Sequence, residues 1–324
     1  MSLQIGIVGS GGMSSRRAEN FHKLKGVEVH SVAARNPETG PALAHRVRAT
    51  CTSNWEDLLT NSEIDALFVG THNALHGPIC IAALEAGKHV FCEYPTARLA
   101  PENRRLAELI ASPDSPVFRL SNNESISAEH AALKERIAGL GPLFTSHFLR
   151  LTPGKGKRPD VLLNLDLTGP PALFFVYHIH TYVSLFGPAN WVHATAHYEG
   201  LKDDKGYDRF TNTVTIGFAS GGTGQWTWAG GIEVESAIQE AQIVTRDATL
   251  IEAADGWDIS TQSDTSPLVF GDNERSLEAL FLADVRDETD WRQDARIGLA
   301  SAAIGHAAEI SAREGRVVRM DEVI

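Results

Sequence analysis

The stretch Leu3-Gln4-Ile5-Gly6-Ile7-Val8-Gly9-Ser10-Gly11-Gly12-Met13-Ser14 decides the fold of the first part of this chain. Its first six residues are an apolar strand pattern, and a glycine-rich turn and a helix start follow. Gly9, Gly11 and Ser14 occupy the positions of a G-x-G-x-x-G turn, with a small serine in place of the third glycine. Such a turn lets the backbone approach a pyrophosphate at a helix N-terminus. We therefore predict a dinucleotide site that comprises Gly9, Gly11, Gly12, Met13 and Ser14.

Strand and helix patterns alternate over the rest of the first 121 residues. Further strands are predicted at 27–34, 65–70, 88–92 and 116–121, and helices at 14–25, 38–48, 78–86 and 101–111. Alternation of this kind is typical of right-handed βαβ units in a parallel, doubly wound sheet. We therefore assign residues 1–121 to an N-terminal Rossmann domain of the α/β class.

The pattern changes to consecutive strands after residue 121. Strands are predicted at 143–151, 190–198, 211–219, 223–229 and 241–253, and helices at 127–138, 274–287 and 291–314. Consecutive strands favour a mainly antiparallel sheet. Residues 122–324 are therefore predicted to form an α+β domain. Trp226 and Trp228 share one strand face, which could belong to the core, an interface or a cleft. A basic loop at 152–159 could bind carboxylates or simply face solvent.

Composition excludes several classes of function. The 324 residues are 43% hydrophobic and carry a formal net charge of −12, which works against nucleic-acid binding. No apolar run is long enough to span a membrane, and we expect no leader before the first strand. The isolated Cys51, Cys80 and Cys92 are interpreted as packing cysteines of a cytoplasmic protein. We predict no metal site, because the histidine pairs lack cysteine or carboxylate partners.

Arg35 follows the second strand, where NAD-binding proteins usually carry a carboxylate for the ribose hydroxyls. An arginine there suits the 2′-phosphate of NADP, so the sequence favours NADP(H) over NAD(H). Alternatively, Arg35 stacks on adenine or faces solvent with either cofactor.

Three further segments carry a family resemblance: residues 65–76, 87–90 and the tripeptide Glu93-Tyr94-Pro95. Together with the glycine turn they resemble the glucose-fructose oxidoreductase/inositol dehydrogenase (Gfo/Idh/MocA) family. The resemblance implies an NAD(P)-dependent oxidoreductase that acts on a small molecule. It also implies that residues 122–324 are the substrate-binding and oligomerisation domain, which forms a homodimer or homotetramer through its sheet. It also implies a set of residues around the nicotinamide: Thr71, His72, Asn73, His76 and Glu93.

Tyr94 is the main departure from the family pattern, which usually has Glu-Lys-Pro at this place. Glu-Tyr-Pro resembles the biliverdin reductases of the family, as do the paired Arg16 and Arg17. A tyrosine can donate a proton but cannot stabilise an alkoxide as a lysine cation does. We therefore predict reduction of a conjugated substrate with Tyr94 as proton donor or positioner. The alternative is that Tyr94 only packs against the nicotinamide or the substrate.

The second domain also departs from the family, because Phe174 and Phe175 fall near the place of the usual aspartate. Of the nearby histidines, His178 is preferred over His180 as the second catalytic candidate; it could equally be a capping or interface residue. Two other functions stay open. One is a sugar or cyclitol dehydrogenase with a second-domain histidine as base, and the other is a non-catalytic dinucleotide-binding protein.

Overall fold

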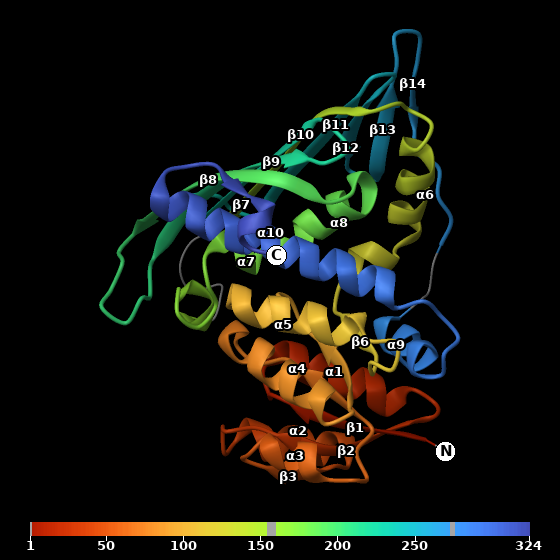
Figure 1. Cartoon of the computed structure of the whole chain (residues 1–324), viewed down its shortest axis with the longest axis vertical. Helices are drawn as coiled ribbons and strands as arrows, with labels where there is room; N and C mark the ends of the chain where they lie inside the picture. Colours follow the sequence, from red (N-terminus) through yellow and green to blue (C-terminus); the bar gives the residue numbers. More distant parts are fainter. Residues whose placement is uncertain (1, 154–159, 273–275) are drawn as a thin grey trace. The chain divides into compact units, whose positions relative to one another are not determined.

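The computed structural model describes residues 2–153, 160–272 and 276–324 (Figure 1). Contacts divide the chain into two compact units, Met1–Asn123 with Arg275–Leu299, and Glu124–Glu274 with Ala300–Ile324. Residues 275–299, which the sequence assigned to the second domain, thus group with the first unit. The functional roles given to the two domains stay predictions. The basic loop noted above lies outside the described residues, except for its first two.

The first unit contains a six-stranded parallel sheet with the order β3-β2-β1-β4-β5-β6. The sheet confirms the predicted doubly wound fold. Its strands are β1 (Leu3–Val8), β2 (Val27–Ala33), β3 (Thr50–Thr52), β4 (Ala66–Val69), β5 (His89–Cys92) and β6 (Phe118–Leu120). The order reverses between β1 and β4, and ligands of open α/β sheets bind at the carboxyl ends of the strands at such a point.

Six α-helices lie entirely within the described part of this unit: α1 (Gly12–Lys23), α2 (Thr39–Val47), α3 (Glu56–Thr60), α4 (His76–Glu85), α5 (Ala100–Ala111) and α9 (Leu277–Val285). Helix α9, drawn in blue, lies beside the red α1 (Figure 1). The rings of Phe91 and Phe281 stack with centroids 5.5 Å apart, and Phe21 meets both edge-on. Burial of these rings explains why a segment from the end of the chain belongs to the first unit.

The second unit contains a nine-stranded sheet with the order β14-β13-β12-β11-β7-β10-β9-β8-β15. It is antiparallel except for the parallel pair β7–β10, which confirms the predicted mainly antiparallel sheet. Its strands are β7 (Leu143–Pro153), β8 (Ala189–Glu199), β9 (Arg209–Phe218), β10 (Thr223–Ile232), β11 (Ile238–Thr245), β12 (Thr249–Ala253), β13 (Gly256–Ser260), β14 (Thr265–Pro267) and β15 (Val318–Arg319). The helices are α6 (Ala128–Ile137), α7 (Pro171–Phe174), α8 (Val176–Phe186) and α10 (Arg292–Glu314), whose first residues belong to the first unit.

The core of the second unit lies between β10 and helices α7 and α8. Trp226 and Trp228 are fully buried, so their shared face belongs to the core. Tyr182 of α8 meets Trp226 edge-on, with centroids 4.9 Å apart. Phe175, between α7 and α8, stacks on Trp228 at 6.0 Å.

The single strand predicted at 241–253 is wrong, because it is the hairpin of β11 and β12. The turn between them contains neither glycine nor proline, which is why the sequence did not reveal it. It is held by Thr245, whose amide donates to the carbonyl oxygen of Ala248 at 2.9 Å. The Thr245 hydroxyl bonds to both the carbonyl and the amide of Ala248.

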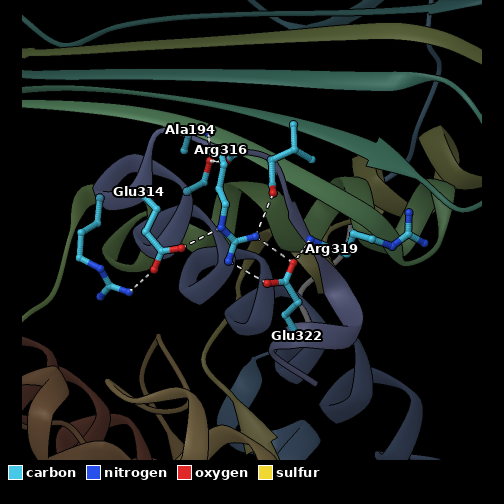
Figure 2. A network of polar contacts seen from close by, with 8 residues as sticks. Ala194, Glu314, Arg316, Arg319 and Glu322 are labelled. Carbon is cyan, nitrogen blue, oxygen red and sulfur yellow. Dashed lines mark hydrogen bonds and ion pairs between the residues drawn. The ribbon is translucent and has the colours of Figure 1, made fainter.

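The C-terminal residues are tied to the second sheet through β15, which pairs with β8. Figure 2 shows Arg316 between Glu314 and Glu322, with N–O distances of 2.8 Å to each carboxylate. The hydroxyl of Ser311 donates to the carbonyl oxygen of Arg316 and accepts the amide of Ala194 of β8 at 2.8 Å. Polar contacts therefore fix the end of helix α10 against the sheet.

All three cysteines are free thiols. Cys80 and Cys92 are buried as predicted, whereas the packing role predicted for Cys51 is wrong. Cys51 lies on β3, the edge strand of the Rossmann sheet, and is exposed. Within the described parts of the chain, no helix combines the length and the apolar composition that crossing a bilayer requires.

Candidate functional site

The glycine turn lies at the carboxyl end of β1, where the strand order reverses. Gly9 has φ +111°, and a Cβ there would lie 2.5 Å from the carbonyl oxygen of Gly70, just after β4. The hydroxyl of Ser14 donates to the same carbonyl at 2.6 Å. Ser14 is completely buried, so a small residue at this position lets α1 pack against the end of β4.

The N-terminus of helix α1 is open. Gly11 is the N-cap residue, no side chain caps the helix, and its first turn contains no acidic residue. A Cβ on Gly11 or Gly12 would meet no atom within 4 Å. Met13 is exposed beside them. The free amides and the positive end of the helix dipole can therefore bind a phosphate group.

Arg35 lies just after β2 and is exposed. Asn36, its neighbour, accepts the backbone amides of Glu38 and Thr39 and forms the turn into α2. The hydroxyls of Ser10 and Thr39 are 2.6 Å apart, so the glycine turn contacts the start of α2. Arg35 therefore lies at the carboxyl ends of the strands, just after β2, which is the neighbour of β1 and its glycine turn.

His76 joins the loop after β4 to the turn after β5. It begins helix α4 and is buried, with Nδ1 2.8 Å from the carbonyl oxygen of Pro95 and Nε2 3.1 Å from that of Thr71. A neutral imidazole donates to only one of these carbonyls. Burial lowers the pKa of His76 below its ordinary value, although both carbonyls act in the opposite direction. Of its neighbours in the loop, Asn73 is buried and His72 is half-buried.

The carboxylate of Glu93 faces a buried polar network inside the first unit. It accepts from the hydroxyl of Ser121 at 2.8 Å and lies 3.4 Å from Nε of Arg17. Burial raises the pKa of Glu93, and Arg17 opposes this effect. Arg17 is itself buried and donates to Glu278 of α9 at 2.8 Å. Sequence reasoning missed this role of Arg17, because its main partner lies far along the chain.

Tyr94 is 7% exposed and precedes Pro95 through a cis peptide bond. A Cβ on Gly298 of α10 would lie 3.4 Å from the Tyr94 hydroxyl oxygen and would overlap the side chain of Leu120. Because Gly298 has no side chain, the side chains of Leu120 and Tyr94 can pack against helix α10 at this position. No sequence pattern indicated the role of Gly298, since a glycine inside a helical pattern has no fixed meaning.

His178 lies in the second unit on helix α8 and is 4% exposed. Its Nδ1 accepts the indole N–H of Trp228 at 3.1 Å. His180, the other histidine considered, is completely buried.

The structure thus brings together Gly9 and Ser14 around Gly70, and Thr71 and Pro95 around His76. Among the described residues, no group of three or more His, Cys, Asp or Glu side chains could hold a metal ion.

Comparison with known proteins identifies a family that the first part of this chain resembles. Residues 3–118 match the Gfo/Idh/MocA oxidoreductase family with its NAD-binding Rossmann fold. Over these residues the chain is similar to the Gfo/Idh/MocA family. This confirms the resemblance drawn from the sequence.

Sequence relatives of this Gfo/Idh/MocA domain are oxidoreductases. Inositol 2-dehydrogenase of Rubrobacter xylanophilus is 26% identical over 42% of this chain and 40% of that enzyme. Levoglucosan dehydrogenase of Pseudarthrobacter phenanthrenivorans is 30% identical over 34% of this chain and 30% of that enzyme. In both pairs the match spans less than half of the relative.

The whole fold is similar to biliverdin reductase from Synechocystis, solved with biliverdin and NADP⁺. The TM-score is 0.85 at 21% identity, and the match covers 96% of this chain and 98% of that one. The similarity in fold therefore extends beyond the segment that the family model matches.

Proposed function

We propose that this chain is an NADP(H)-dependent reductase of a conjugated small molecule. The observation that carries the proposal is the arrangement of Gly9 and Ser14 around Gly70 at the reversal of the strand order. It leaves an open helix N-terminus beside a backbone that a phosphate can approach. This place is where a Rossmann domain binds the pyrophosphate of a dinucleotide.

The described residues fit a dinucleotide. The exposed Gly11, Gly12 and Met13 would contact the pyrophosphate, and the loop from Thr71 to His76 would lie along the nicotinamide. Arg35 would bind the 2′-phosphate, since a guanidinium suits a phosphate well. When bound, the cofactor supplies a hydride.

Tyr94 supports reduction over oxidation. Its phenol can donate a hydrogen bond or a proton to the group that receives the hydride. Burial removes it from bulk water, which strengthens such a hydrogen bond. The likeness in fold to a biliverdin reductase supports a linear tetrapyrrole as the first acceptor to test.

A second candidate is oxidation of a sugar or cyclitol, which the inositol and levoglucosan dehydrogenases among the relatives favour. In that reaction a second-domain histidine, His178, would act as the base. The reductase needs a group that donates a proton to the substrate, whereas the dehydrogenase needs a base that removes one. Experiments can therefore distinguish the two candidates.

Fluorescence titration with NADPH and NADH, followed by turnover assays, tests the proposal. We expect tighter binding of NADPH, and Arg35→Ala should weaken NADPH binding about tenfold while leaving NADH binding unchanged. With biliverdin as acceptor, Tyr94→Phe should lower kcat by about a hundredfold or more and preserve NADPH binding. Oxidation of inositol by NAD⁺ without any reductase activity would overturn the proposal in favour of the second candidate. Tight binding of NADPH without turnover of either substrate class would indicate a non-catalytic protein.

We also propose that the protein works in a reducing cytoplasm as a homodimer or homotetramer. Its three free thiols support the compartment. The exposed face of the second sheet supports the assembly, because it is available to a second copy of the chain. His147 and Gln225 are exposed on this face, whereas their neighbours Phe148 and Trp226 are buried on the opposite face. Light scattering coupled to gel filtration would detect the assembly, and a monomer would exclude it.

A further inference from the structure

A bulge in strand β2 brings a histidine and a hydroxyl group together near the edge of the Rossmann sheet. The register of β1 with β2 shifts after the pair of Ile5 and Val29, and Gly6 then pairs with Ser31. His30 is therefore the extra residue of β2 at this place. Consecutive side chains of a regular strand point to opposite faces of the sheet. Here Nδ1 of His30 lies only 2.8 Å from Oγ of Ser31, because the bulge turns the two side chains towards each other.

Polar contacts extend from this pair in both directions. Nε2 of His30 lies 3.3 Å from Oε2 of Glu63, which precedes β4. Oγ of Ser31 lies 2.6 Å from Oγ1 of Thr50, the first residue of the edge strand β3. Ser31 is 6% exposed, whereas Thr50 is an exposed residue. The hydroxyl of Thr50 is thus joined to a carboxylate through a buried hydroxyl and an imidazole.

The chemistry of these groups determines where the protons lie when His30 is neutral. A carboxylate accepts hydrogen bonds and cannot donate them, so Nε2 of His30 donates to Glu63. Nδ1 then carries no proton and accepts the hydroxyl proton of Ser31. Since Ser31 has a single hydroxyl proton, the bond between Ser31 and Thr50 is donated by Thr50. The hydroxyl protons of both residues therefore point along the chain of contacts towards His30.

The same contacts accommodate the charged form of His30. An imidazolium donates from Nδ1 to Ser31, and Ser31 then donates to Thr50. The hydroxyl of Thr50 has another acceptor for its own proton, the carbonyl oxygen of His30 at 3.2 Å. No polar group in this chain of contacts loses its partner when His30 takes up a proton. His30 can therefore act as a general base for the two hydroxyl groups.

We propose that Thr50 is an acyl acceptor, a modification site for esters that have a good leaving group. The Thr50 oxygen forms a new bond to the carbonyl carbon of the ester, while its proton passes through Ser31 to Nδ1 of His30. The bond to the leaving group then breaks, the leaving group departs as its anion, and His30 releases the proton to water. Thr50 retains the acyl group as an ester, and nothing is oxidised or reduced. Because Thr50 is exposed, the reagent can approach it from solvent.

Acetylation by 4-nitrophenyl acetate tests this role on the full-length protein. Cys51 is an exposed thiol next to Thr50 and can react with the same reagent, so the parent protein and all variants carry Cys51→Ala. Mass spectrometry of proteolytic peptides locates the acetyl groups and follows their accumulation with time. We expect Thr50 to gain one acetyl group. Thr60 is the internal control, because it is also exposed but its hydroxyl bonds to the carbonyl oxygen of Asp57 at 3.3 Å and should not react.

Substitution of His30 separates the base from its structural role. The side-chain amide of His30→Gln can still bond to Ser31 but takes up no proton at neutral pH, so acetylation of Thr50 should slow about a hundredfold. His45→Gln, at an exposed histidine of α2, is the matched control and should leave the rate unchanged. Glu63→Gln should slow the reaction less than His30→Gln does, because the Glu63 side chain is 76% exposed.

Ser31→Ala interrupts the path of the proton at a second point and should slow acetylation as much as His30→Gln does. Circular dichroism verifies that each variant is folded. Acetylation of Thr50 that is no faster than that of Thr60 would overturn the proposal. So would an equal rate in the parent and in folded His30→Gln, or an acetyl group on Ser31 in place of Thr50.

Discussion

The hydroxyl of Ser14 and the carbonyl oxygen of Gly70 are 2.6 Å apart and form a hydrogen bond between the start of α1 and the end of β4. Gly9 lies against the same carbonyl. Gly9, Ser14 and Gly70 therefore meet at one point, where no side chain larger than that of serine fits between the glycine turn and the end of β4.

Gly9→Ala should abolish dinucleotide binding and destabilise the protein. Gly9 has φ +111°, and the new Cβ would lie 2.5 Å from the Gly70 oxygen. Strain and overpacking together should lower the free energy of unfolding by about 2 kcal/mol or more. Urea unfolding and NADPH titration measure both effects.

Gly87→Ala is the matched control, since Gly87 has φ +75° but open space around it. It should cost about 1 kcal/mol and leave binding unchanged. Equal effects of the two variants would contradict this account.

Stability should fall with decreasing pH because of His76. Burial lowers the pKa of His76 in the folded protein below its ordinary 6.5. The unfolded chain then binds the proton more readily. The contribution of His76 to the free energy of unfolding is therefore constant above about pH 7.5 and decreases as the pH falls through 6.5. Urea unfolding of the protein and of His76→Gln between about pH 5 and 8 measures this dependence, and the variant should show a weaker one. An identical dependence would exclude His76 as its source.

Glu93 should produce a dependence of the opposite sign. Burial raises its pKa above the ordinary 4.5, so the folded protein retains this proton over a wider range than the unfolded chain. The contribution to stability is full below pH 4.5 and is lost as the pH rises through the folded-state pKa. The difference in unfolding free energy between the protein and Glu93→Gln should change in that interval. A change with the sign found for His76→Gln would contradict the assignment.

Asp284→Asn should destabilise the first unit strongly. Asp284 and Arg119 form an ion pair in which their side chains are 0% and 4% exposed, and Thr289 also donates to Asp284. Removing the charge leaves a buried guanidinium whose remaining acidic partner among the described residues is the partly exposed Asp294, at 3.4 Å. We expect a loss of about 3 kcal/mol in chemical unfolding. Asp294→Asn is the control and should cost less than about 1 kcal/mol. Similar losses would show that Asp284 is not the main partner.

Gly298→Ala should displace the residues that surround Tyr94. Alanine favours a helix, but its Cβ would overlap Leu120 and approach the Tyr94 hydroxyl. We expect a net destabilisation of about 1–3 kcal/mol and a lower kcat. Adding Leu120→Ala should restore the room, so that kcat recovers in the double variant. If kcat stays low there, the loss does not arise from Leu120.

Much of the fold could be predicted because local patterns coincide with the tertiary structure. The apolar run of β1 is followed at once by the glycine turn, and the Rossmann strands alternate with helices. Helix α4 begins at His76, two residues before the Pro78 that the sequence suggested as its start. The preceding 3-10 turn, Asn73–Leu75, leads into it. Such boundaries depend on local turns that composition does not specify.

The candidate site was predicted less completely, because its supports come from distant parts of the chain. The residues of the glycine turn are local and were found. Trp228, 50 residues after His178, gave no signal of its hydrogen bond. Gly298 likewise had no recognisable pattern. Contacts between distant segments depend on the packing of whole elements, which one sequence does not reveal.

The ion pair of Arg17 and Glu278 joins residues 261 positions apart. During synthesis on the ribosome, all strands of the Rossmann sheet emerge long before α9. Until then Arg17 lacks the carboxylate of Glu278, and the Phe91 ring lacks Phe281. Residues 3–118, which match the family model, therefore lack these two buried contacts until α9 has been synthesised. The completion of these contacts waits for the last sixth of the chain, and a nascent chain stopped before α9 would present a partly open Rossmann core to chaperones.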